Sequence, residues 1–343
     1  MSGEPLSTTE AVTSPSLPSP APVAGEGGDG GVAGPAPAGG SPGAARARRA
    51  NERLGRRLVL PGQVMLIGLV TFPALVALYI SFTRWSPSTG YDWYEAFRVW
   101  SWLSNYDGVF GASFLSAFIR TVLMTGVAVG LEFALGLGIA LLFMSRFPMH
   151  RVGSVLMLIP MMITPAVAGF IFFLLLQSNG PVNGILSAVV PGNVELRWLS
   201  DPTLAPIAVV LADVWQWTPF MFLILLAGLL AVPDDQVKAA QILGASWAQI
   251  FRRIVLPIIK PIILIALILR AMEAFKLFDS AWLMTKGGPG EASSTISVKL
   301  YRDAFLSDQW SYVAALAIVV MIVVSLAAAR AVRSLERVQE AQT

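Results

Sequence analysis

Four charged side chains lie inside an apolar stretch that is long enough to cross a membrane. Arg270, Glu273, Lys276 and Asp279 follow one another at a spacing of three residues, which makes consecutive members neighbours on a helix. A charge at the bilayer centre costs about 2.5–3.5 kcal/mol on insertion scales. The charges deep in the span must therefore be paired or face a polar cavity. Two compatible readings stay open: an ion-pair ladder in which Glu273 reaches both Arg270 and Lys276, or a polar wall of a translocation path.

A second cluster has the residue types of a sugar-binding surface. Sugar recognition needs flat apolar faces for C–H groups and convergent polar groups for hydroxyls. Trp215, Gln216, Trp217 and Phe220 supply both kinds beside Pro219, where a kink is predicted. The alternative is that both tryptophans only pack between helices.

Composition removes most catalytic chemistry. The chain has no cysteine and a single histidine, His150, which excludes thiol catalysis, thiolate metal sites and histidine-rich metal sites. No Gly-x4-Gly-Lys-[Ser/Thr] phosphate loop occurs, so ATP hydrolysis is not expected in this chain. Glu132 and Asp213 are further intramembrane acids, and hydrogen bonding between helices is their favoured role. An enzyme built on that pair is an alternative that no motif supports. We therefore assign no catalytic, cofactor-binding or metal-binding residue.

The elements that position these residues are predicted to be membrane-spanning helices. Of the 343 residues, 55% are hydrophobic and 13% are charged, whereas a soluble domain carries about 25% charged residues. The net charge of +3 is too small to indicate nucleic-acid binding. A span needs about 20 apolar residues and must be helical in lipid. Six stretches qualify, predicting an all-α polytopic membrane protein: 58–82, 117–144, 152–176, 204–231, 258–283 and 312–330.

The distribution of Lys and Arg sets the direction of these spans. A basic run from Arg46 to Arg57 precedes the first span, and further cations gather in alternate loops and after the last span. By the positive-inside rule, both termini face the cytoplasm. The chain then divides into a disordered Pro/Gly/Ala-rich tail ending in this basic anchor at 1–57, a transmembrane domain at 58–332 and a short cytoplasmic tail at 333–343. The tail is expected to be a dispensable extension, with a regulatory or docking role as the alternative.

The cytoplasmic loop at 232–257 carries the signals of two short helices. The first opens after Pro233 and stops at Gly244, a natural C-terminal residue. Ser246 and Gln249 predict a capping box that opens the second, which Pro257 is expected to end. An exposed amphipathic segment of this kind docks in a partner's groove or lies on lipid. The apolar residues recur at helical spacing: Val237, Ala240 and Leu243, then Trp247, Ile250, Phe251 and Ile254.

This loop resembles the EAA loop of binding-protein-dependent ABC importer permeases. That pattern is Glu-Ala-Ala, three residues, Gly, nine residues and Ile-x-Leu-Pro, and both spacings match here. Two positions depart from it, because Lys238 replaces the glutamate and Leu243 stands where Asp is frequent. The departures bear on one polar contact to the ATPase and not on the architecture. The resemblance implies ATPase-coupling roles for Lys238, Ala239, Ala240, Gly244, Ala245, Trp247, Phe251, Leu256 and Pro257.

Other segments are similar to carbohydrate permeases of the maltose F-like and glycerol-phosphate A-like type. They are 103–106, 215–220, 270–279 and 285–290, and the resemblance covers about 58–332. It implies a six-helix type I importer permease with a cytoplasmic coupling helix and a cavity near the bilayer midplane. The residues that would line this cavity are Trp215, Gln216, Trp217, Phe220, Arg270, Glu273, Ala274 and Leu277.

The resemblance also implies an assembly in a bacterial inner membrane. Its members would be a second permease subunit, two ATP-binding subunits holding ATP and magnesium, and an extracytoplasmic solute-binding protein. The substrate would be a carbohydrate, and the scarcity of further intramembrane cations favours a neutral sugar. A stand-alone secondary transporter of polar solutes is the alternative, although such a protein needs no helical cytoplasmic loop like the one at 232–257 and usually shows internal repeats.

Overall fold

The computed structural model describes residues 42–144, 150–190 and 195–340, with side chains at 59–144, 152–190 and 195–336. The chain divides into two compact units, 1–66 and 67–343. Several sequence predictions fall outside the described residues or side chains. They are the tail up to residue 41, the side chains of the basic run from Arg46 to Arg57 and of His150, and the last residues of the C-terminal tail.

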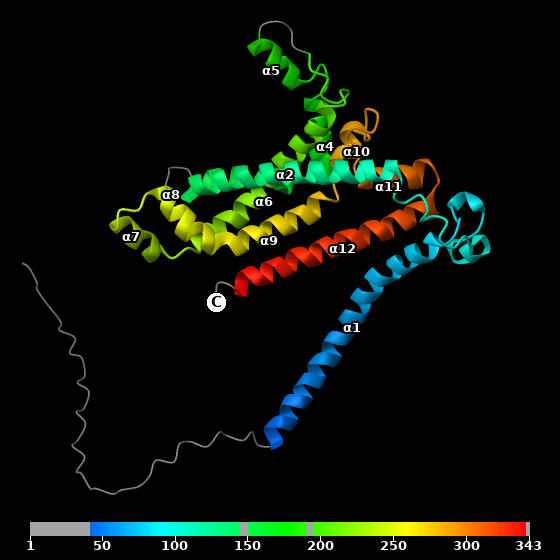
Figure 1. The fold of residues 1–343 in the computed structure, drawn as a ribbon, viewed down its shortest axis with the longest axis horizontal. Helices are drawn as coiled ribbons and strands as arrows, with labels where there is room; N and C mark the ends of the chain where they lie inside the picture. The colour runs from blue at the N-terminus through cyan, green and yellow to red at the C-terminus, as the bar shows by residue number, and fades with distance from the viewer. Residues whose placement is uncertain (1–41, 145–149, 191–194, 341–343) are drawn as a thin grey trace, which may run out of the picture. The chain divides into compact units, whose positions relative to one another are not determined.

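Helices make up the described part of the chain, whose one β pairing is an isolated bridge between Thr83 and Trp100. The α-helices are labelled in Figure 1. In chain order they are α1 (Pro42–Ser81), the 3-10 helices η1 (Pro87–Thr89) and η2 (Trp93–Val99), α2 (Ala112–Met144), α3 (His150–Met162), α4 (Pro165–Leu175), α5 (Pro181–Val189), α6 (Leu204–Leu230), α7 (Asp234–Ile242), α8 (Trp247–Ile250), the π-helical turn η3 (Phe251–Val255), α9 (Leu256–Ala274), α10 (Asp279–Thr285), α11 (Ile296–Tyr301), the π-helical turn η4 (Arg302–Leu306) and α12 (Trp310–Glu340).

Five helical segments in the described ranges are long and apolar enough to cross a membrane, and they become six if the bent pair of α3 and α4 is counted as one span. This confirms the predicted architecture. The five are Val59–Ser81, Ala112–Met144, Leu204–Leu230, Trp247–Ala274 and Trp310–Glu336.

The third predicted span is not one kinked helix, as the sequence suggested. α3 and α4 meet at an angle of 95°. Pro165 disfavours a helical conformation at the residue before it, and Thr164 is accordingly extended, with ψ 147°. The Thr164 side chain then caps α4 by accepting a bond from the Val167 N–H. The proline at 165 therefore ends one helix and opens another.

The fifth predicted span differs from expectation at both ends. Pro257 does not end the second helix of the cytoplasmic loop, because α8, η3 and α9 form one continuous segment from Trp247 to Ala274. The π-helical turn shifts the hydrogen-bond register just before the proline, with the Leu256 N–H donating to the Phe251 carbonyl. At the other end the helix stops at Ala274 instead of reaching Leu283, and α10 starts after a short turn.

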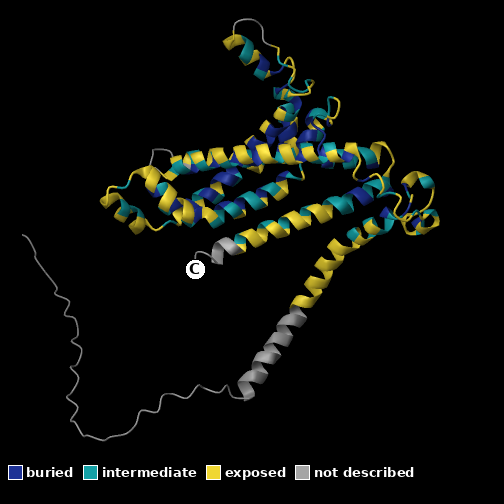
Figure 2. Ribbon diagram, in the orientation of Figure 1, coloured by how far each residue is buried: buried dark blue, intermediate teal, exposed yellow. Residues whose placement is uncertain are grey.

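α6 is the central helix of the described bundle. It contacts α2, α3, α4, α9 and α10, and more than half of its residues are buried; Figure 2 colours buried residues dark blue. Its closest neighbour is α2, where a Cβ at Gly136 would lie 2.7 Å from the Met221 Cβ and 2.9 Å from the Phe222 nitrogen. A glycine is therefore required for this approach. The intramembrane acids of α2 and α6 are brought together by the same packing.

Candidate functional site

Arg270 of α9 ties together three helices. Its Nε and Nη2 donate to the Glu132 carboxylate of α2 at 2.7 and 2.8 Å. Nη2 also donates to Asp213 of α6. The three side chains are between 0 and 6% exposed, and the guanidinium lies 5.0 Å from the ring centroid of Trp217. The expectation that Glu132 and Asp213 hydrogen-bond between helices is therefore confirmed.

The predicted ion-pair ladder is only half correct. Glu273 pairs with Lys276 at a distance of 2.8 Å, but Arg270 does not share it. Two carboxylates converge on the Arg270 guanidinium in a buried site, where charge-assisted bonds are strongest. The Glu273–Lys276 pair is half exposed. The buried cluster around Arg270 is thus followed, at the end of α9, by one exposed ion pair that joins Glu273 to Lys276 in the next turn.

A small polar cavity lies beside this cluster, where the bend before α4 faces α6, α9 and α10. Its volume is about 80 Å³, below the 300–1,000 Å³ of typical ligand pockets. Four predicted path residues line it: Trp217, Arg270, Glu273 and Leu277. Lys276 and Asp279, which belong to the charged series read as a possible polar wall, also line it, whereas Pro165, Asp213, Phe278 and Ser280 were not predicted to be path residues. The run of charges up to Asp279 is the signal in the sequence, but the approach of Pro165 and Ser280 depends on tertiary packing.

The other predicted path residues do not line this cavity. Gln216 is buried and donates from Nε2 to the Ile163 carbonyl at 2.7 Å, which is the carbonyl at the bend between α3 and α4. Ala274 is buried in the core. Trp215 packs on the Phe172 ring of α4 at 5.5 Å between centroids. Phe220 lies beside Trp217, 6.1 Å away.

The loop between α6 and α9 forms a sharp elbow at Gly244. This residue has φ +77°, a left-handed conformation that favours glycine. The Ala245 N–H donates to the Ala240 carbonyl and the Gly244 N–H to the Gln241 carbonyl, each at 3.0 Å. This pair of bonds is a Schellman motif. Ser246 and Gln249 form the predicted capping box, so both helix ends at the corner are fixed by local hydrogen bonds.

The elbow turns part of its apolar surface inward and part outward. Ile250 is buried, and Val237, Ala240, Ala245, Phe251 and Ile254 pack against the core formed by α2, α6 and α9. At the corner, Ile242 and Leu243 are 86% and 87% exposed, and Trp247 is 54% exposed. The outward residues form the tip of the elbow: Ile242, Leu243 and Trp247. Ile242 was missed because its position in α7 falls outside the predicted apolar stripe.

Among the remaining predicted coupling residues, Lys238 lies on the exposed side of α7. Its Nζ is 3.7 Å from Asp234, one turn earlier. Ala239 of α7 is also exposed, as are Leu256 and Pro257 at the start of α9. A concavity of about 330 Å³ follows the inner edge of the corner, and is lined by Leu243, Gly244, Ala245, Gln249, Ile250, Arg253 and Ile254.

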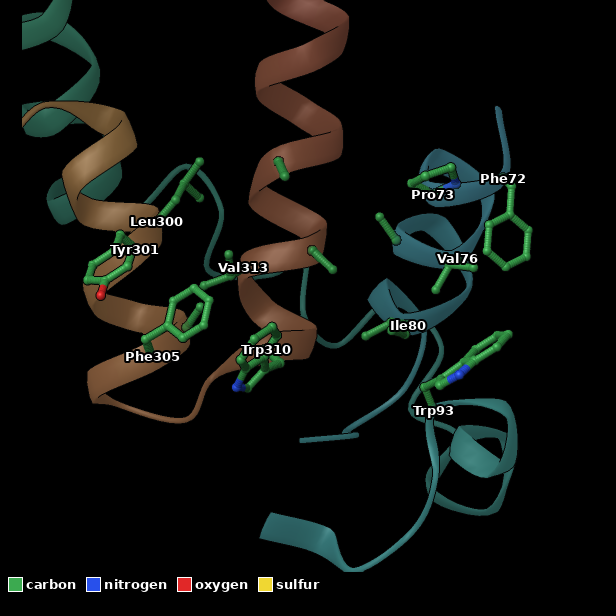
Figure 3. A pocket seen from close by; sticks show the side chains of 14 residues that line it. Phe72, Pro73, Val76, Ile80, Trp93, Leu300, Tyr301, Phe305, Trp310 and Val313 are labelled. Carbon is green, nitrogen blue, oxygen red and sulfur yellow. The ribbon is translucent and has the colours of Figure 1, made fainter. Parts of the chain in front are cut away.

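The apolar groove in Figure 3 is a different kind of surface. It has a volume of about 600 Å³, and α1, α12 and the segment around η4 line it with side chains such as Phe72, Phe305 and Trp310. The lining is almost wholly apolar. It therefore lacks the convergent polar groups that a polyol requires.

Residues 132–338 match the model of a protein family described as binding-protein-dependent transport system inner membrane component. The chain belongs to this family. It is 36% identical over 262 residues to the trehalose/maltose transport system permease protein MalF of Thermococcus litoralis, which covers 75% of this chain and 85% of the relative. It is 34% identical over 257 residues to the trehalose transport system permease protein SugA of Mycobacterium tuberculosis, covering 73% and 78%. The predicted family resemblance is thereby confirmed.

A solved structure shows the same fold. A chain from the crystal structure of a bacterial ABC transporter involved in the import of the acidic polysaccharide alginate aligns with a TM-score of 0.71. The two chains are 20% identical, and the alignment covers 85% of this chain and 99% of the other. The family assignment, together with the long apolar helices, makes this chain an inner-membrane permease component of a binding-protein-dependent transport system.

Proposed function

We propose that the chain is one of two permease subunits in an ATP-driven sugar importer, where it forms half of the translocation path. The observation that carries the coupling role is the elbow at Gly244, which is fixed by a Schellman motif and presents Ile242, Leu243 and Trp247 outward. Relatives above 30% identity that transport trehalose or maltose support a carbohydrate substrate.

The elbow is built to transmit force. Moving a two-state protein from 1:99 to 99:1 requires about 5.5 kcal/mol of differential binding, and this energy would come from partner ATPases that hold ATP and magnesium. The helix from Trp247 to Ala274 has 28 residues, a length of about 42 Å. It connects the elbow directly to Arg270. A displacement of the elbow would therefore reach the cluster that joins α2, α6 and α9.

The remaining partners follow from the same proposal. They are the second permease subunit, two ATP-binding subunits and an extracytoplasmic solute-binding protein, in a bacterial cell membrane with both termini of this chain cytoplasmic. The cavity beside Arg270 is too small for a hexose ring in this conformation. We propose that it widens into the sugar path when the helices move.

Two substitutions at Gly244 test the coupling role. A Cβ at Gly244 would meet no atom of this chain within 4 Å, but φ +77° strains any side chain there, so Gly244→Trp combines this backbone strain with a large side chain that would collide with whatever covers the elbow. We expect Gly244→Trp to abolish sugar uptake and co-purification of the ATPase. Gly244→Asn is the matched control, because asparagine tolerates the left-handed conformation. Wild-type uptake and ATPase binding in Gly244→Trp would overturn the proposal, and a chain that never binds an ATPase would favour a secondary transporter.

A further inference from the structure

A second pocket lies at the far ends of α4 and α10. The two helices run in the same direction, and a Cβ at Gly169 would lie 3.0 Å from the Ser280 Cα. Both begin at the cavity beside Arg270 and end at this pocket, about 16 Å further along α4. Its volume is about 570 Å³, within the range of small-ligand pockets. Figure 1 shows the two helices adjacent to each other.

The pocket combines two cations with neutral hydrogen-bonding groups. Arg197, in the segment before α6, and Lys286, at the end of α10, are its charged residues, and no Asp or Glu lines it. Within the described ranges, neither cation has an ion-pair partner. The uncharged polar residues in the lining are Gln177, Ser178, Asn179, Ser200 and Thr285.

Lys286 is held in an unusual backbone conformation. It is the C-terminal cap of α10, with φ +52°, where glycine is the preferred residue. Strained positions of this kind concentrate at ligand-binding sites. The lysine puts a cation on the pocket wall at a position where glycine would fit the backbone better.

We propose that this pocket binds a sugar acid, whose carboxylate lies between Arg197 and Lys286 and whose hydroxyls meet the amide and hydroxyl groups of the lining. The proposal rests on the proposed function in sugar import and narrows its substrate class. A guanidinium binds a carboxylate through paired, charge-assisted hydrogen bonds. The concave shape and the amide-rich lining fit a small polyol better than a protein surface. The sequence favoured a neutral sugar because few further cations lie within the spans. Arg197 and Lys286 lie outside the spans, so that argument did not consider them, and the proposed substrate is an acidic sugar instead.

The test uses the full-length chain in lipid nanodiscs and follows thermal unfolding by tryptophan fluorescence. A ligand that binds the folded state raises the unfolding midpoint in a concentration-dependent way. We expect sodium glucuronate to raise it in a saturable manner, and glucose or sodium acetate at equal concentration to have much less effect. Arg197→Gln and Lys286→Gly should each weaken the apparent glucuronate affinity about tenfold or more, as expected for a charge-assisted bond. Glycine suits the backbone at 286, so misfolding does not explain that loss.

Arg84→Gln is the matched control, since it removes an exposed cation outside the pocket. It should leave the glucuronate affinity unchanged. Equal affinity in wild type and both pocket variants, or equal binding of glucose, overturns the proposal. If glucuronate has no effect but the pocket variants lose stimulation of ATP hydrolysis by the solute-binding protein, the cations serve a protein carboxylate instead. Co-purification with an ATPase in the same membranes, without glucuronate binding, would overturn this inference alone and leave the importer proposal standing.

Discussion

Arg270 connects its helix to two others through a single side chain. Its partners Glu132 and Asp213 are 138 and 57 residues away in sequence. Spacing within one helix revealed Glu273 as a neighbour of Lys276, and this pair exists. It could not reveal that acids on α2 and α6 converge on Arg270, because that depends on how the helices pack. The individual charges were therefore predictable from the sequence, and most of their pairing was not.

Replacing Arg270 should be far more harmful than replacing Lys276, which lies just after the same helix. Arg270→Met leaves two buried carboxylates without their cation, and breaking a buried pair costs about 3–5 kcal/mol. Lys276→Met breaks an exposed pair, which is worth about 0–1 kcal/mol. Denaturant unfolding of the purified chain in micelles measures both. A loss in Arg270→Met as small as the one expected for Lys276→Met would show that the buried cluster does not stabilise the fold.

Of the two charged residues predicted to line the path, Arg270 is occupied by buried carboxylates, whereas Glu273 is accessible to a substrate. It lines the polar cavity and is half exposed. We expect Glu273→Gln to raise the KM for sugar uptake about tenfold, the effect of losing a hydrogen bond to a charged group, with normal assembly of the complex. Lys276→Gln breaks the same ion pair from the other side. If both variants lose uptake equally, the pair itself is needed and Glu273 has no separate contact with substrate.

At the scale of elements, features fixed by neighbouring residues could be predicted from the sequence, and features supported by distant side chains could not. The capping box at Ser246 and the glycine corner at Gly244 depend on neighbours within a few residues, and both were predicted correctly. The break in the third span and the end of the fifth are also supported by side chains from elsewhere. Gln216 satisfies the Ile163 carbonyl at the first break, and Thr295 donates to the Leu277 carbonyl at the second, at 2.8 Å. No pattern within either span records these partners.

Gln216 gives a test of whether the broken span needs its support. Gln216→Met leaves the Ile163 carbonyl without its donor, which should cost about 1–3 kcal/mol of stability. Gln236→Met is the matched control, since that glutamine is exposed on α7. Thermal unfolding midpoints and sugar uptake are measured together. A variant that keeps full stability but loses uptake would show that Gln216 contacts the substrate, as the sequence reading suggested.

At the scale of the whole molecule, the mechanism requires the elbow and the segment between η4 and α12 to face opposite sides of the membrane. The last two segments of suitable length, Trp247–Ala274 and Trp310–Glu336, are separated by α10, α11 and η4. The distribution of Lys and Arg predicts that the elbow is cytoplasmic. An ATPase can reach the elbow only if this orientation is correct.

The cysteine-free sequence allows this orientation to be tested directly. Gln236, on α7 of the elbow, and Ser307, just after η4, are both exposed, and each can be changed to a single cysteine. We expect a membrane-impermeant maleimide to label Ser307→Cys in intact cells and Gln236→Cys only after the membranes are opened. The unsubstituted chain reports background labelling. The reverse pattern would place the elbow outside the cell, where no cytoplasmic ATPase could act on it. The helix that connects the elbow to Arg270 could then not transmit the energy of ATP hydrolysis.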